Sequence, residues 1–144
     1  MNKKYFFLII GAILIIIDQI TKVLLLNVNI DFGFFALKYI ENTGISFGLF
    51  QGSTVIISFI SVIVLGLLYY FRKEFKGNEI WLTLIVSGII GNLIDRVFLG
   101  YVRDFFDLKW WPVFNVADSL MFIGVFGLLI THLLFELKMK KQKN

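Results

Sequence analysis

Residues 53–71 read STVIISFISVIVLGLLYYF, an apolar run without a single charged side chain. Crossing the hydrocarbon of a bilayer takes about 20 mostly apolar residues, so this run predicts a membrane helix. Three further stretches are nearly as apolar and cover about residues 5–26, 80–100 and 113–137. Lipid accepts only helices or closed barrels, and the alternating pattern of barrel strands is missing. The sequence therefore predicts an all-α membrane protein with four transmembrane helices, in a single integral domain over residues 1–144.

The composition is that of a membrane protein. Hydrophobic residues make up 58% of the chain, whereas soluble domains average about 45–50%. The chain has no cysteine and a single histidine, His132. This excludes disulfides, thiolate catalysis and metal sites built from cysteine or from several histidines. We expect no metal and no other cofactor.

The basic residues predict the orientation. Nine of the 14 fall on one side of the four expected helices. They are Lys3, Lys4, Arg72, Lys73, Lys76, Lys138, Lys140, Lys141 and Lys143. By the positive-inside rule, both termini and the loop 72–79 should be cytoplasmic, and the loops 27–52 and 101–112 should face outward.

The first expected helix also has the beginning of a cleavable signal peptide, with Lys3 and Lys4 before the apolar residues 5–17. The next residues, 18–22, read DQITK and lack a site of small residues for cleavage. We therefore expect this helix to be retained.

Acidic residues gather on the opposite, outer half. Asp18, Asp95 and Asp118 lie at the outer ends of three expected helices, and hydropathy alone brings them to one depth. A carboxylate at a helix centre costs roughly 2.5–3.5 kcal/mol on insertion scales. Acids kept near lipid are therefore candidates for a functional site.

The two outer loops are not simple turns. Residues 32–50 mix aromatic, β-branched and glycine residues, which predicts short strands around a turn at residues 42–44. Residues 101–114 are rich in Phe and Trp, which favour the membrane–water boundary. We expect both loops to lie on the bilayer surface.

Several polar residues have helical spacing. Asp18 and Lys22 are four residues apart and share one helix face. They could form an ion pair, shape a functional site, or do both. Asn92 and Arg96 are also four apart, and we expect Arg96 to point toward the interface, where it could hold a carboxylate or a lipid headgroup. For Asp95 the interpretation as a structural contact between helices is favoured, with Gly88 and Gly91 allowing close packing.

The polar residues just before and at the start of the last helix have competing interpretations. Asn115 suits a helix N-cap, whereas Asp118 lies beyond the cap position and is less well explained by capping. Asp104 and Asp107 could be ordinary solvated loop acids.

Five motifs carry a family resemblance. In chain order they are Asp18-Gln19-x-Thr21-Lys22, Asn42-Thr43-Gly44-x-x-Phe47, Gly91-Asn92-Leu93-Ile94-Asp95-Arg96, Val102-x-Asp104-Phe105 and Phe114-Asn115-x-Ala117-Asp118. With these motifs the chain resembles lipoprotein signal peptidase (signal peptidase II), a bacterial membrane aspartyl protease family, over nearly its whole length. Ile45-Ser46 and residues 87–90 depart from the usual small residues, which would affect packing or pocket shape rather than chemistry.

The resemblance implies roles for individual residues. Asp104 and Asp118 would be the catalytic pair. The residues that shape the site or bind substrate would be Asp18, Lys22, Asn42, Asn92, Arg96 and Asn115. It also implies a small extracytoplasmic β-cradle formed by the outer loops.

The resemblance further implies the activity and setting. The enzyme would remove the signal peptide from diacylglyceryl-modified prolipoproteins, cutting just before the lipidated cysteine through a water activated by two carboxylates. It would work in the bacterial cytoplasmic membrane with its site at the extracytoplasmic face, as a monomer without nucleic-acid partners, and globomycin-type compounds would inhibit it. Two other classes stay open from the residues alone: a small ion or solute carrier, and an assembly factor that binds lipid or signal sequences without turnover.

Overall fold

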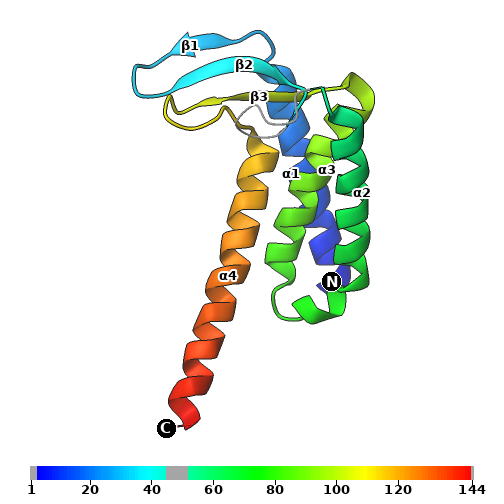
Figure 1. Ribbon diagram of the computed structural model, residues 1–144, viewed down its shortest axis with the longest axis vertical. Coiled ribbons are helices and arrows are strands. Elements are labelled where there is room, and N and C mark those ends of the chain that lie inside the picture. Colours follow the sequence, from blue (N-terminus) through cyan, green and yellow to red (C-terminus); the bar gives the residue numbers. More distant parts are fainter. Residues whose placement is uncertain (1–2, 45–51, 144) are drawn as a thin grey trace.

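The computed structural model describes residues 3–44 and 52–143. Within these two ranges, four α-helices and three short strands follow one another (Figure 1). In order they are α1 (Lys3–Leu24), β1 (Asn29–Asp31), β2 (Ala36–Asn42), α2 (Thr54–Tyr70), the 3-10 turn η2 (Arg72–Phe75), α3 (Glu79–Leu99), β3 (Val102–Asp107) and α4 (Val116–Lys143).

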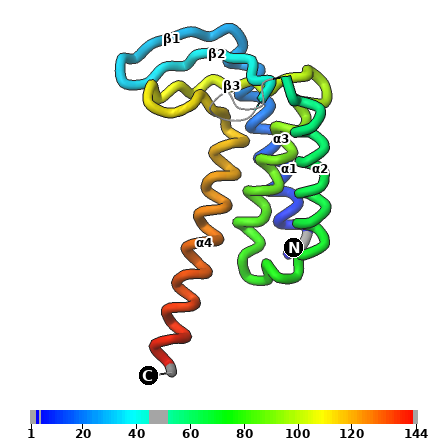
Figure 2. The backbone as a smooth tube through the Cα atoms, in the orientation of Figure 1, coloured from blue at the N-terminus to red at the C-terminus, as the bar shows by residue number. Residues whose placement is uncertain are grey.

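Helix α3 is the centre of the bundle because α1, α2 and α4 all contact it. Helices α1, α2 and α3 run side by side, while α4 leans away from them toward its C-terminus (Figure 2). The three strands lie across the opposite end of the bundle from the chain termini. Glycines allow the close approach of α4: a Cβ on Gly88 would overlap the carbonyl oxygen of Ala117, and one on Gly124 would lie 2.6 Å from Ile85.

Three of the described helices are long and apolar enough to cross a membrane. These spans are Tyr5–Leu24, Glu79–Leu99 and Val116–Gln142. Helix α2 is apolar but has 17 residues, or about 26 Å at 1.5 Å per residue, against a hydrocarbon core of about 30 Å. The chain is therefore a largely helical membrane protein, and a fourth span through α2 stays a prediction.

Helix α4 begins three residues later than the sequence predicted. Phe114 pairs with Phe106 of β3 through two backbone hydrogen bonds. The N–H of Phe114 donates to the carbonyl of Phe106 at 3.1 Å, and the N–H of Phe106 donates to the carbonyl of Phe114 at 2.8 Å. This pairing keeps Phe114 extended, and the helix starts at Val116.

The strands form one antiparallel sheet in the order β1-β2-β3. Residues 32–35 connect β1 to β2, where Gly33 adopts a positive φ of 88° and its N–H donates to Asp31 Oδ1 at 2.8 Å. The expected turn after Asn42 is present, since the N–H of Gly44 donates to Asn42 Oδ1 at 2.9 Å. The part of that prediction that concerns residues 45–50 lies outside the described residues. A small sheet is thus present, and its role as a substrate cradle stays a prediction.

The most buried part of the molecule is polar. The buried apolar side chains include Val102, Phe105 and Ala117. Among the described residues they are outnumbered by buried polar ones, which are Asp18, Lys22, Ser87, Asn92, Asp95, Arg103, Asp104 and Asn115. All but Ser87 belong to one cluster where the sheet meets α1, α3 and α4, and apolar side chains on the outer faces of the helices are exposed, as lipid contact requires.

Candidate active site

Asp104 lies on β3 and Asp118 in the first turn of α4, both at the sheet end of the bundle. Asp104 is only 2% exposed. Asn115 Nδ2 donates to its Oδ1 at 2.6 Å, and Asn42 Nδ2 donates to its Oδ2 at 2.9 Å. Each oxygen of this carboxyl therefore has a side-chain amide donor, one from α4's cap and one from the end of β2.

Asp118 and Asn115 bond each other reciprocally. The N–H of Asn115 donates to Asp118 Oδ2 at 3.1 Å, and the N–H of Asp118 donates to Asn115 Oδ1 at 2.9 Å. This is the capping-box arrangement of an N-cap residue with the residue three positions later. The expectation that capping explains Asp118 poorly is therefore wrong. Its carboxylate, three residues after the N-cap Asn115, accepts a hydrogen bond from the backbone N–H of that residue.

Asn115 contacts both acids, since its amide nitrogen bonds Asp104 and its backbone bonds Asp118. Burial, followed by the Asp118 carboxylate, raises the pKa of Asp104 to about 7, although the amides of Asn42 and Asn115 act in the opposite direction. Two acids with one proton between them at neutral pH can accept a proton from water and donate one to a neighbouring oxygen.

Asn92 connects this pair to the interior. Its Oδ1 accepts from Lys22 Nζ and from Asn115 Nδ2, both at 3.0 Å, and its Nδ2 donates to Asp118 Oδ1 at 2.8 Å. An ammonium group can only donate, so Lys22 fixes which end of the amide faces inward. The Asn92 donor must then face Asp118.

Two buried cations and two buried carboxylates lie behind Asn92. Lys22 pairs with Asp18 at 2.8 Å and lies 3.4 Å from Asp95, and Arg103 pairs with Asp95 at 2.7 Å. The expected ion pair of Asp18 and Lys22 is confirmed, as is the structural contact through Asp95. Asp18 also accepts from the N–H of Ala117 at 2.9 Å, so α1 holds the start of α4, one residue before Asp118.

Arg96 lies beside the turn at the end of β2. Its Nη2 donates to the carbonyl of Gly44 at 3.1 Å, and its buried Nε has no hydrogen-bond partner among the described residues. It therefore contacts the turn after β2, and the expectation that it points toward the membrane interface stays a prediction. Asp107 stays outside the cluster and accepts from the N–H of Lys109.

Two members of the cluster, Arg103 and Gln19, had no role assigned from the sequence. Arg103 donates to Asp95 from its backbone N–H, its Nε and its Nη2, and Nη2 also donates to Gln19 Oε1 at 2.9 Å. Successive strand residues point to opposite faces, so anchoring Arg103 turns Asp104 toward Asn115. The available signal for Arg103 was a cation next to Val102 and close to Phe105, because burial of a lone cation would be costly and calls for an acidic partner.

A cavity of about 700 Å³ opens beside Asp118. Aromatic and aliphatic side chains from the 108–114 segment and from α4 line it, including Trp110, Trp111, Phe122 and Phe126. The arrangement places an acid at the edge of a space suited to apolar chains. Among the described residues, no group of three or more acidic or histidine side chains could hold a metal ion.

Comparison with known proteins identifies the family to which this chain is similar. The family described as signal peptidase (SPase) II matches residues 10–135. A lipoprotein signal peptidase of Fusobacterium nucleatum is 44% identical, with 93% of this chain and 88% of that protein covered. The lipoprotein signal peptidase of Caldanaerobacter subterraneus is 41% identical over 81% of this chain and 88% of its own length. A solved structure, described as a bacterial membrane enzyme studied by the in meso method at 2.3 Å resolution, superposes with a TM-score of 0.82 at 30% identity, covering 88% of this chain and 87% of that one.

Proposed function

Since this chain belongs to the signal peptidase II family, whose members named above are lipoprotein signal peptidases, we propose that it removes signal peptides from prolipoproteins as an aspartyl endopeptidase with Asp104 and Asp118 as its catalytic pair. The observation that carries the proposal is the junction at Asn115, which bonds both acids at the edge of an apolar cavity. The raised pKa of Asp104 supports it, because one acid of such a pair must hold a proton at working pH.

The reaction needs no covalent intermediate. The ionised acid accepts a proton from water as the water oxygen attacks the scissile carbonyl carbon, and the protonated acid donates to the carbonyl oxygen. The tetrahedral intermediate then collapses with cleavage of the C–N bond, and the pair returns a proton to the leaving amine. The two acids share the proton that the resting pair holds, so the titration belongs to both acids together.

The remaining cluster residues position the pair. Asn42 and Asn115 hold the carboxyl of Asp104, and Asn92 holds that of Asp118. Asp18 and Lys22 lie behind them, where Lys22 orients the Asn92 amide. Arg96, whose Nε has no hydrogen-bond partner among the described residues, would bind the substrate backbone or the lipidated cysteine region.

The substrate class follows from the cavity and the depth of the site. A diacylglyceryl-modified cysteine keeps its acyl chains in the bilayer while its peptide bond lies at headgroup depth. The aromatic cavity beside Asp118 offers apolar walls at that point. We place the site at the extracytoplasmic face of a bacterial cytoplasmic membrane, with cytoplasmic termini and a monomeric chain, and expect globomycin-type inhibition.

The test compares Asp104→Asn and Asp118→Asn with Asp107→Asn, an acid on the same strand outside the cluster. Both site variants should lose cleavage of a diacylated prolipoprotein peptide by at least about 1,000-fold, because each removes one partner of the proton relay. Asp107→Asn should keep near-normal turnover, and an unlipidated peptide should be a poor substrate. All three variants should fold, and thermal unfolding in detergent checks this.

Normal turnover by folded Asp104→Asn or Asp118→Asn protein would refute the catalytic pair. Tight peptide binding without any turnover by the unmodified chain would instead favour the assembly-factor class. A carrier is disfavoured by the position of the polar cluster at one end of the bundle, since alternating access needs a site near the midplane.

A further inference from the structure

A second cavity, of about 780 Å³, lies among α1, α2 and α3, and its lining includes neither Asp104 nor Asp118. Its walls are apolar side chains of all three helices, among them Phe7, Ile15, Leu65, Leu68, Val86 and Ile90. Gly11 opens the wall on α1, where a Cβ would lie 3.3 Å from Ser87 Oγ. The space is therefore suited to a narrow apolar chain.

The depth of this cavity matches one leaflet. Its lining on α1 extends from Lys3 to Ile15, which is about 18 Å at 1.5 Å per residue. On α3 it extends from Glu79 to Ile90, about 16 Å by the same rise. Half of a hydrocarbon core of about 30 Å is about 15 Å, so an acyl chain fits this length better than a peptide helix, which would cross both leaflets.

The mouth of the cavity carries net positive charge. Lys3, Arg72 and Glu79 line it, and Lys3 Nζ pairs with Glu79 Oε1 at 3.2 Å. Arg72 donates Nη1 to the carbonyl of Tyr69 at 2.7 Å and lies 4.2 Å from the centre of the Tyr69 ring. Within the described residues Arg72 has no carboxylate partner, so its guanidinium is available to a phosphate.

We propose that this cavity binds one anionic phospholipid of the leaflet on the side of the chain termini. One acyl chain fills the space among the three helices, and the headgroup phosphate contacts Arg72. Bound there, the lipid joins α2 to α1. This site is separate from the peptidase site and does not depend on the assignment of Asp104 and Asp118.

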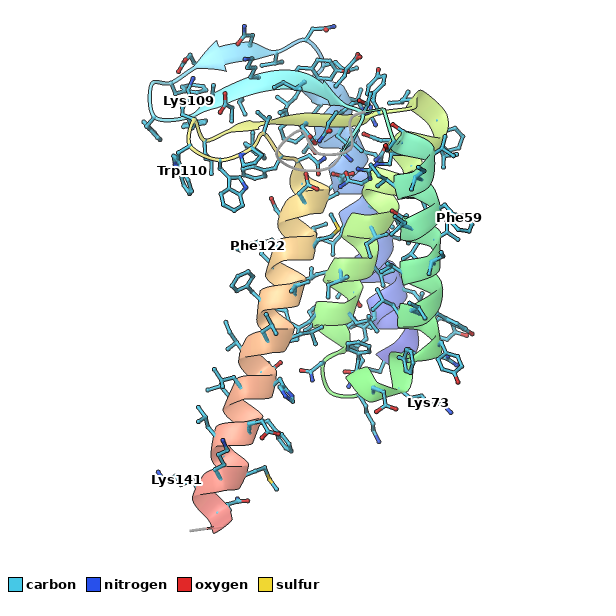
Figure 3. The ribbon with its side chains drawn as sticks, in the orientation of Figure 1. Phe59, Lys73, Lys109, Trp110, Phe122 and Lys141 are labelled. Atoms are coloured by element: carbon cyan, nitrogen blue, oxygen red, sulfur yellow. The ribbon has the colours of Figure 1, made fainter. Side chains whose placement is uncertain are left out.

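Two pairs of variants of the full chain test this in detergent, with dioleoyl phosphatidylglycerol titrated and retained lipid counted by native mass spectrometry. Arg72→Gln should weaken binding about fivefold, the equivalent of about 1 kcal/mol for one basic residue near an anionic surface. Its control, Lys73→Gln, removes the same charge one residue along, outside the cavity lining (Figure 3). Ala12→Phe should fill the cavity and abolish retention, whereas Ile13→Phe, on the neighbouring face that does not line it, should not.

Phosphatidylcholine with the same acyl chains should bind at least fivefold more weakly than phosphatidylglycerol. Equal binding of the two lipids would overturn the proposal, as would equal losses in Arg72→Gln and Lys73→Gln, which would indicate only diffuse attraction. Unchanged retention by Ala12→Phe, with normal thermal unfolding in the absence of lipid, would place the lipid elsewhere. The readout is independent of peptidase activity.

Discussion

At the scale of single residues, Asp104 couples the proposed chemistry to stability. Its pKa is raised from 3.8 to about 7, first by burial and then by Asp118. The folded chain therefore binds this proton more tightly than the unfolded chain. The stabilisation is fully present below about pH 4 and is lost as the pH rises through about 7.

This gives a pH prediction. The free energy of unfolding should fall by about 3 kcal/mol between pH 4 and pH 7 through Asp104, and Asp104→Asn should flatten that part of the profile. Thermal unfolding in detergent across this range measures it. Asp107→Asn serves as the control and should keep the slope of the unmodified chain. If Asp104→Asn keeps that slope as well, Asp104 ionises normally in the folded chain.

The sequence predicted which residues belong to the polar cluster better than it predicted the hydrogen bonds and ion pairs between them. Helical spacing was enough to pair Asp18 with Lys22, because a helix fixes which residues are neighbours. Arg103 could not be placed the same way, since its partners Asp95 and Gln19 come from two different helices. Spacing is informative within an element, whereas contacts between elements depend on how the elements pack.

At the scale of elements, the contact between α3 and α4 controls where Asp118 lies. A Cβ on Gly88 would overlap the carbonyl of Ala117, the residue just before Asp118, and would approach Met121 Cγ to 2.6 Å. The close-packing role expected of Gly88 and Gly91 is confirmed, since a Cβ on Gly91 would lie 2.6 Å from Asp18 Oδ2. The helices cannot separate locally without moving the start of α4.

Gly88→Ala should therefore destabilise the chain by about 1–3 kcal/mol, the usual cost of overpacking, and should also lower peptide cleavage through displacement of Asp118. The matched control is Gly66→Ala on α2, where an added Cβ meets nothing within 4 Å. That change should be neutral or slightly stabilising, because alanine favours helix. Thermal unfolding and turnover of both variants provide the measurement, and equal effects would refute a specific contact at Gly88.

The helices were predictable as elements because lipid requires long apolar runs, which hydropathy detects directly. Their ends were less so. The start of α4 depends on Phe114 pairing with Phe106 of β3, a contact between segments that periodicity does not report. The hairpin at residues 32–35 was also missed, because its Phe-rich turn resembles a membrane-surface segment more than a turn.

At the scale of the whole molecule, the two ends of the bundle differ in chemistry. The sheet end holds the buried acids and the aromatic cavity, and the opposite end holds the basic mouth of the second cavity. Lys3 and Arg72, at the basic end, belong to the residues from which the orientation was predicted, so the orientation itself stays a prediction. Helix α2, which buries none of its residues, is the element whose crossing most needs a direct test.

The chain has no cysteine, so single cysteines can report orientation against a silent background. Figure 3 shows Lys109 at the sheet end and Lys73 and Lys141 at the other. In intact spheroplasts, a membrane-impermeant maleimide should label Lys109→Cys and leave Lys73→Cys and Lys141→Cys unlabelled, with the reverse pattern in inside-out vesicles. Because α2 connects the sheet end to Lys73, labelling of both Lys109→Cys and Lys73→Cys from outside would mean that α2 does not cross. Labelling of Lys141→Cys from outside would invert the orientation and move the proposed peptidase site to the cytoplasmic face, where it could not meet a translocated prolipoprotein.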